Sequence, residues 1–292
     1  YLNISTESLL FYFILLFFLF YFVKIIFLIF ISWYEQSFMT TFVEKLSSKL
    51  FLNYIRQNFH FFMRKNTAEL FRNTILEIDN AAAYIQAFFR VLLESLIVFT
   101  LVILLLFVNM TTTIITSIIF LIVSYGYLKI VRKKAENWGE QRLQSTSKRI
   151  QFLQEGIGAV KDIKLLGRES FFFNNFKAHN LKLAELGVKI GFVNQLPKHI
   201  LEFVAISAII LIFFTLNMYS VNFTEIFTIL GLYIAVAFKI MPSANRIVNS
   251  LQQIKYINPS INTLAKEIKN FEIADSNEST SDEKILFKKE IS

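Results

Sequence analysis

The stretch VLLESLIVFTLVILLLFVNMTTTIITSIIFLIVSYGYL, residues 91–128, decides the fold class. It holds two apolar runs, 91–108 and 113–128, which are separated by a short turn at Asn109, Met110 and Thr111 that contains no Lys or Arg. A helix needs about 20 predominantly apolar residues to cross the hydrocarbon core of a bilayer. The two runs therefore predict a pair of membrane-spanning helices joined by a tight turn.

Three further apolar runs flank this pair, at residues 8–31, 203–216 and 226–238. Of the 292 residues, 54% are hydrophobic, and the chain contains only three Pro and eight Gly. Because segments of alternating polarity are few, helices are favoured over a transmembrane barrel. We expect an all-α membrane protein with five visible spans.

The basic residues predict the orientation of these spans. Lys and Arg are concentrated in residues 35–90 and 129–198, whereas the short connections 109–111 and 217–225 contain none. The positive-inside rule then places both polar stretches in the cytoplasm and the beginning of the chain outside, in a multi-pass protein of the inner or plasma membrane. The same rule accounts for the net charge of +8 without nucleic acid as a partner.

Several kinds of chemistry are not indicated by the composition. The chain has no Cys, which excludes disulfides, thiolate metal sites and cysteine catalysis. The three histidines (His60, His179 and His199) are scattered, so no metal site is expected. No catalytic residues are predicted either.

The polar stretches have the pattern of helices rather than of loops. Residues 129–166 contain no Pro, and apolar residues recur there at helical spacing, as at Ile150, Leu153 and Ile157. A continuous helix over this range would be on the order of 50 Å long. Residues 35–57 and 170–196 have the same pattern. We expect the membrane helices to continue beyond the bilayer as two hairpins of long stalks.

Each hairpin needs a tip. At the second tip, Gly167 is the predicted C-cap of the stalk, a short helix over 168–176 follows, and the chain returns from Lys177. At the first tip, residues 61–79, Asn66 or Thr67 is expected to cap a new helix with Glu69 in its first turn. Both tips are thus predicted to be short transverse helices.

Three consecutive phenylalanines, Phe171, Phe172 and Phe173, lie just after the predicted cap of the second tip. Clustered exposed apolar side chains usually mark a partner surface. The alternative is that these rings pack against the neighbouring stalk.

Several segments of the sequence resemble the transmembrane domain of ABC exporters. EGIGAVKDIKLLGRESFFFNNF (155–176) resembles the family's second coupling segment, and RKNTAELFRNTILEIDN (64–80) is similar to the first. PKHILE (197–202) and MPSANRIVNSLQQI (241–254) resemble the fifth and sixth helices of the family. The resemblance covers nearly the whole chain and looks closest to the subgroup that contains bacterial lipid-linked oligosaccharide flippases.

This resemblance implies that the tips insert into grooves on ATP-binding domains, whose ATP-driven closure alternates access to the translocation pathway. A second half-transporter, forming a homodimer, and membrane lipid are the other implied partners. The positions that match the coupling segments are Arg64, Lys65, Asn66, Thr67, Glu69, Gly167, Arg168, Glu169, Phe171, Phe172 and Phe173.

The sequence departs from the family pattern at both ends. It has no G-x-x-x-x-G-K-[ST] phosphate loop, and one membrane helix fewer than the family before the first coupling segment. We therefore expect a fragment with a transmembrane domain over 1–271, a flexible linker over 272–283 and the start of a nucleotide-binding domain at 284–292. ATP and Mg²⁺ are expected in that domain, fused or separate, so the full-length protein is expected to be an ABC-type ATPase translocase.

Basic residues near the predicted inner mouths of the spans suggest a cargo class. Lys24, Arg90, Lys239 and Arg246 are candidates for a basic vestibule, with Lys198, Glu94 and Glu202 nearby in sequence. Such a vestibule suits a lipid-linked or anionic amphiphile. The alternative is that these are ordinary interfacial lysines and arginines.

The sequence alone leaves other function classes open. A secondary transporter or channel with helical stalks would need polar or broken helices at membrane depth. An intramembrane enzyme would need paired acids, a Ser/Lys set or a His cluster there. A structural scaffold has no residue signature of its own.

Overall fold

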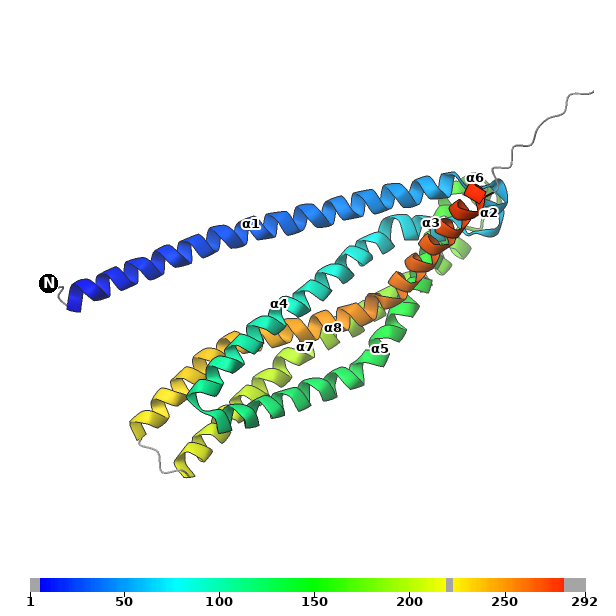
Figure 1. The fold of residues 1–292 in the computed structure, drawn as a ribbon. Coiled ribbons are helices and arrows are strands. Elements are labelled where there is room, and N and C mark those ends of the chain that lie inside the picture. Colours follow the sequence, from blue (N-terminus) through cyan, green and yellow to red (C-terminus); the bar gives the residue numbers. More distant parts are fainter. Residues whose placement is uncertain (1–5, 219–222, 281–292) are drawn as a thin grey trace, which may run out of the picture. The chain divides into compact units, whose positions relative to one another are not determined.

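The computed structural model describes residues 6–218 and 223–280, with side chains for 10–215 and 226–271. Apart from two single-residue joints and three short breaks, all of these residues are helical, and no strand occurs among them (Figure 1). The elements are α1 (Thr6–Ile55), α2 (Phe59–Arg64), α3 (Thr67–Phe71), the π-helix η1 (Arg72–Glu77), α4 (Ile78–Val108), α5 (Met110–Gly158), α6 (Val160–Leu166), α7 (Glu169–Met218) and α8 (Phe223–Thr280). The expected all-α membrane fold is confirmed.

The chain divides into two units, Tyr1–Leu52 and Asn53–Ser292. The first unit contains α1 as far as Leu52, and the large apolar side chains of this helix between Leu10 and Ile31 are 42–70% exposed on all sides. A helix that is apolar all round is typical of a membrane span. The first predicted span, 8–31, lies within this helix.

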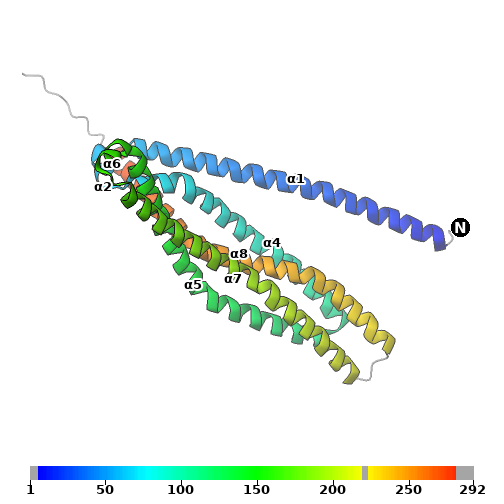
Figure 2. The same ribbon diagram turned by 180° about the vertical axis from the view of Figure 1, so that it is seen from behind.

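The second unit is built on four long helices. Within it, α4 packs along α8 and α5 packs along α7, and α8 also contacts α5 and α7. Figure 2 shows the same four helices from behind, with α2 and α6 gathered at one end of the unit, which we call the tip end. The opposite end, where α4 meets α5, is the turn end.

At the turn end, Asn109 alone separates α4 from α5. Its backbone is extended, and its side chain accepts a hydrogen bond from the Thr112 backbone N–H at 3.1 Å, so it caps α5. The hydroxyl of Tyr233 on α8 lies 2.7 Å from Thr112 Oγ1 and 2.6 Å from Thr113 Oγ1. These contacts fasten α8 to the turn, and the predicted tight connection is confirmed.

Within the described residues, five helical segments are long and apolar enough to cross a membrane: Leu10–Ile55, Thr67–Val108, Met110–Gly158, Glu169–Thr215 and Ile226–Phe271. Each has at least 42 residues, which corresponds to roughly 60 Å at 1.5 Å per residue. The hydrocarbon core is only about 30 Å thick. Every one of these segments therefore extends well beyond its apolar run.

The helices α5 and α7 form an antiparallel hairpin. The rings of Phe152 and His179 stack with centroids 5.9 Å apart, and closer to the turn end the Tyr127 hydroxyl donates to the Val193 carbonyl at 2.6 Å. The pairing thus continues over many turns of both helices. The second pair of stalks expected from residues 129–198 is present.

The second tip differs from its prediction in the position of the short helix. The stalk breaks at Ala159, where φ is −106° and ψ is 28°, and the short helix is α6, which lies before Gly167 rather than after it. The two glycines just before the break, Gly156 and Gly158, weaken the end of α5. Beyond Gly167, α7 runs without interruption past Phe176 and Lys177, because neither residue ends a helix.

The first tip shows the same shift. Asn66 caps the new helix as predicted, since its side chain accepts from the Ala68 backbone N–H at 2.9 Å. The helix that begins there is not short, however, because α3 passes through η1 into α4 with helical backbone at both joints. The short helix is α2, which Asn58 caps and which ends at Lys65.

The C-terminal predictions fall partly outside the described residues. Helix α8 continues to Thr280 and so covers most of the segment expected to be a linker, 272–283. The predicted start of a nucleotide-binding domain, 284–292, lies outside the described residues.

Candidate functional site

Large apolar side chains are exposed on both short helices at the tip end. On α2, Phe59 is 78% and Met63 is 71% exposed, and on α6, Leu165 is 75% and Leu166 is 72% exposed. We call these four side chains the tip surface. They lie far from the apolar runs along the chain, in a part of the molecule where lipid does not account for their exposure.

The second tip has a well-defined cap. Gly167 has φ 62° and ψ 33°, the Gly167 N–H donates to the Lys164 carbonyl, and the Arg168 N–H donates to the Ile163 carbonyl at 3.0 Å. This is a Schellman motif, and the left-handed residue in it is usually Gly. Lys164 Nζ pairs with Glu169 Oε1 at 3.0 Å across the turn, which joins α6 to α7. The predicted cap at Gly167 is confirmed.

The three phenylalanines are not equivalent. Phe171 and Phe173 are 54% and 61% exposed, whereas Phe172 is half-buried. The Phe172 ring packs where Gly156 lacks a side chain, 3.8 Å from the point that a Cβ there would occupy. Packing against the neighbouring stalk therefore applies to Phe172 alone.

The first-tip residues also divide into outward and inward sets. Arg64 and Thr67 are exposed, and Glu69 is half-buried. Lys65 Nζ pairs with Glu267 Oε1 of α8 at 2.6 Å, and Asn66 Nδ2 donates to Gln151 Oε1 of α5 at 3.1 Å. Lys65 and Asn66 thus attach the tip to the helices behind it.

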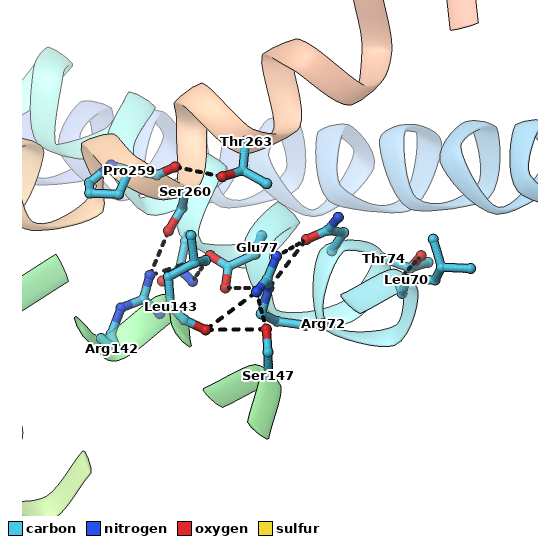
Figure 3. A network of polar contacts seen from close by, with 12 residues as sticks. Leu70, Arg72, Thr74, Glu77, Arg142, Leu143, Ser147, Pro259, Ser260 and Thr263 are labelled. Atoms are coloured by element: carbon cyan, nitrogen blue, oxygen red, sulfur yellow. Dashed lines mark hydrogen bonds and ion pairs between the residues drawn. The ribbon is translucent and has the colours of Figure 1, made fainter. Parts of the chain in front are cut away.

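A buried ionic network lies directly behind this attachment (Figure 3). The Glu77 carboxylate is fully buried, with Oε1 3.6 Å from Arg72 Nε and Oε2 3.3 Å from Arg142 Nη2. Arg142 also donates to Ser260 Oγ at 2.5 Å, and Arg72 Nη2 donates to Asn73 Oδ1 at 2.8 Å. These contacts join η1, α5 and α8 at one point.

Arg72 makes further contacts to α5. Its Nη1 donates to the Leu143 carbonyl at 3.3 Å and to the Ser147 hydroxyl. Removing one member of a buried ion pair usually costs about 3–5 kcal/mol, because the remaining charge is left uncompensated. Moving η1, α5 or α8 relative to the other two at this point would break these contacts and therefore cost free energy.

Glu267 of α8 forms a second junction, which we define as its contacts with Tyr54 and Lys65. Its Oε2 accepts from the buried Tyr54 hydroxyl at 2.6 Å, while its Oε1 pairs with Lys65. The Phe271 ring packs edge-on against Tyr54, with centroids 5.4 Å apart, and also contacts Phe61 of α2 at 6.4 Å. The end of α8 is thereby fixed to α2.

Sequence analysis missed both junctions, although each leaves a signal. Leu264, Glu267 and Phe271 follow one another at helical spacing and are all buried, so Glu267 occupies a core position of α8. Glu77 stands between Leu76 and Ile78. A carboxylate in an apolar register needs a buried partner, and basic residues on neighbouring helices supply it.

The residues proposed for a basic vestibule are only partly brought together. Arg246 of α8 forms an ion pair with Glu94 of α4, in which Arg246 Nη2 lies 3.0 Å from Glu94 Oε2. Lys239 and Arg90 are exposed, on either side of this pair along the two helices. Lys24 belongs to the first unit, where its Nζ lies 4.9 Å from the centre of the Tyr21 ring. The vestibule stays a prediction.

No set of three or more His, Asp or Glu within the described ranges is placed to hold a metal ion. The tip end thus presents two short helices with exposed apolar residues. The exposed Lys164–Glu169 pair links α6 to α7, and the partly buried Lys65–Glu267 pair links the end of α2 to α8.

Comparison with known proteins identifies the family. Residues 2–240 match the model of the ABC transporter transmembrane region. This chain belongs to that family. The match to the ABC transporter transmembrane region and the five long apolar helices of the described residues show a multi-pass membrane protein.

Two curated relatives are flippases by name. The ATP-dependent lipid A-core flippase of Cupriavidus pinatubonensis (strain JMP 134 / LMG 1197) is 29% identical over 173 residues, which cover 58% of this ABC transporter chain and 29% of the relative. The ATP-dependent lipid A-core flippase of Ralstonia nicotianae (strain ATCC BAA-1114 / GMI1000) is 24% identical over 180 residues, or 58% of this chain and 30% of the relative. The chain therefore matches about three tenths of the length of these relatives.

Proposed function

We propose that this chain is the membrane-spanning part of an ATP-driven exporter or flippase, and that α2 and α6 receive the force generated by ATP-binding domains. Closure of those domains would displace the two short helices. The long helices attached to them would then change the side of the membrane on which the pathway is open.

One observation carries this proposal: the tip end combines an exposed apolar surface with a rigid attachment. Phe59, Met63, Leu165 and Leu166 are more than 70% exposed, as expected for side chains that a partner covers. Glu77 of η1 pairs with Arg72 of the same helix and with Arg142 of α5, and Glu267 of α8 pairs with the partly exposed Lys65. A push on the tip surface would therefore move η1, α5 and α8 together.

The partners follow from the same proposal. ATP and Mg²⁺ would be bound by the nucleotide-binding domain, fused to this chain or separate, which supplies the phosphate loop that these 292 residues lack. A second copy of the chain would complete the pathway as a homodimer. The tip end would face the cytoplasm, across the inner or plasma membrane, as the distribution of basic residues indicates.

The proposed cargo is an amphiphile with an anionic head group. The names of the two flippase relatives support a lipid cargo. The exposed basic side chains of Arg90 and Lys239, on either side of the Arg246–Glu94 pair, would attract a phosphate-bearing head group.

Site-specific crosslinking tests the docking of the tips. The chain has no Cys, so a single Cys at Leu166 or at Phe59 is the only thiol among these residues. In membranes that contain the full-length protein and its ATP-binding domain, a short bifunctional thiol reagent should join each position to a Cys introduced in that domain. The yield should change when ATP is added.

A matched control is Cys at Val188, which is 72% exposed on α7 but lies about five helical turns from the second tip. It should give no adduct with the same domain. Equal adduct formation at Val188 and Leu166, or none at Leu166 and Phe59 in a folded dimer, would contradict the proposal.

A further inference from the structure

A cavity of about 680 Å³ lies beside the first tip, between α3, η1, α5 and residues 263–270 of α8, with His179 of α7 on its wall. Small-molecule sites typically occupy roughly 300–1,000 Å³. Among the 16 lining residues, Leu143 is the one with an aliphatic side chain. Most of the lining residues therefore offer hydrogen-bonding or charged groups to an occupant.

The net charge of the residues that line the cavity favours an anionic ligand. Four basic side chains line the cavity (Lys65, Arg72, Lys148 and Lys266), against the two carboxylates Glu69 and Glu267. With His179 neutral, the lining carries a net charge of +2. Such a surface attracts negative ligands and repels cations.

The basic residues are not all free to bind a ligand. Arg72 faces the buried Glu77, and Lys65 is paired with Glu267. Lys148 and Lys266 form no ion pair with any carboxylate in the described part of the chain; the Lys148 ammonium donates to the Gln151 amide oxygen at 3.2 Å. These two lysines project from α5 and from α8, so an anion held by both would bridge the two helices.

The position of the cavity favours a soluble ligand over a lipid. Arg72 on its wall is separated from the start of the apolar run at residue 91 by about 28 Å of helix. A lipid head group lies at the edge of the hydrocarbon core and would not reach this far. Phosphate groups are also the anions that several lysine ammonium groups bind well.

We propose that this cavity binds a small, water-soluble, phosphate-bearing anion, which Lys148 and Lys266 hold between α5 and α8. The site is separate from the tip surface and from the predicted vestibule. Because the occupant bridges two of the long helices next to the tip, its binding stiffens the connection through which the tips act.

A titration with tripolyphosphate tests the site. The full-length protein, with the lysine of the phosphate loop in its ATP-binding domain replaced so that this loop does not contribute, is titrated in uncharged detergent micelles without ATP while Tm and heat of binding are measured. Saturable binding with a rise in Tm is expected, because a ligand that binds only the folded state stabilises it. Lys148→Gln and Lys266→Gln should each raise Kd by about tenfold, as expected for loss of a charge-assisted hydrogen bond.

The matched control is Lys269→Gln, which removes an equal charge from the next turn of α8, outside the cavity. It should leave Kd within about twofold, and Lys266→Arg, which keeps the charge, should bind nearly as well as the unchanged protein. Absence of saturable binding, or an equal loss of affinity in Lys269→Gln and Lys266→Gln, would overturn the proposal.

A second set of stability measurements distinguishes a soluble anion from a lipid head group. Micelles with phosphatidylglycerol and without tripolyphosphate should show no stabilisation that depends on Lys266. If the lipid gives that stabilisation and tripolyphosphate does not, the ligand is a head group and the soluble anion is wrong.

Discussion

Gly167 sets the backbone path at the second tip. Its φ of 62° lies in the left-handed region, and no atom stands within 4 Å of the position that a Cβ would take. A side chain at this position would therefore cost free energy only because L-residues disfavour this backbone conformation. Gly167→Ala should lower the free energy of unfolding by about 1–2 kcal/mol, as measured by denaturation in mixed micelles.

Gly158→Ala is the control for this change. Gly158 also has open space at its Cβ position, but it lies in α5 without a positive φ. Alanine is favoured over glycine in a helix by about 0.5–1 kcal/mol, so this variant should be more stable. Equal effects of the two substitutions would contradict the Schellman geometry at the tip.

Glu77 compensates the buried Arg72 and the half-buried Arg142. Glu77→Gln keeps the shape of the side chain but leaves Arg72 and Arg142 without a negative charge between them. We expect a loss of about 3–5 kcal/mol in the free energy of unfolding. Glu69→Gln, at a half-buried position where no ion pair is formed with a described residue, should cost less than about 0.5 kcal/mol. Similar losses in both variants would show that the network does not form.

At the scale of helices, α5 and α8 approach one another at Gly139. A Cβ built at Gly139 would stand 2.1 Å from the Tyr256 carbonyl oxygen and 3.3 Å from the Pro259 ring. Gly139→Ala must therefore push the helices apart, with an expected cost of about 1–3 kcal/mol or more. The measurement is again the free energy of unfolding in mixed micelles.

Gly126→Ala provides the comparison on the same helix, because nothing lies within 4 Å of its Cβ position. It should be neutral or slightly stabilising. If Gly139→Ala is equally well tolerated, α5 and α8 do not make this contact.

The helices could be predicted from the sequence better than their breaks. The five apolar runs each lie within a long helix, because a run of that length and composition has few other solutions in a membrane. The caps at Asn66 and Gly167 were also predictable, since each depends on local chemistry. The break at Ala159 was not, because alanine favours helix and the nearby Gly156 and Gly158 weaken a helix without fixing where it ends.

The partners of Glu77 and Glu267 could not be predicted, for a different reason. Glu77 meets Arg142, and Lys65 meets Glu267, across distances of 65 and 202 residues along the chain. Which basic residue reaches which acid depends on how the helices pack, and a single sequence does not reveal that. The same holds for the cavity lined by Lys148 and Lys266.

At the scale of the whole molecule, side-chain contacts connect the first tip to the far ends of the membrane helices. Ion pairs join the first tip to α8 and η1 to α5, and the Tyr233 contacts join α8 to the α4–α5 turn. Each of these junctions lies within the same unit. A displacement at the tip end would thus be transmitted along helices of about 50 residues to the turn end.

The most direct test measures whether ATP bound at one end moves the other. Spin labels on Met110→Cys, 67% exposed at the turn end, report the distance between the two copies in the full-length dimer with its ATP-binding domains. A non-hydrolysable ATP analogue should shift this distance. Leu165→Asp with Leu166→Asp should abolish the shift without abolishing ATP binding, whereas Val188→Asp should keep it. A shift that persists when both leucines are replaced would contradict the account.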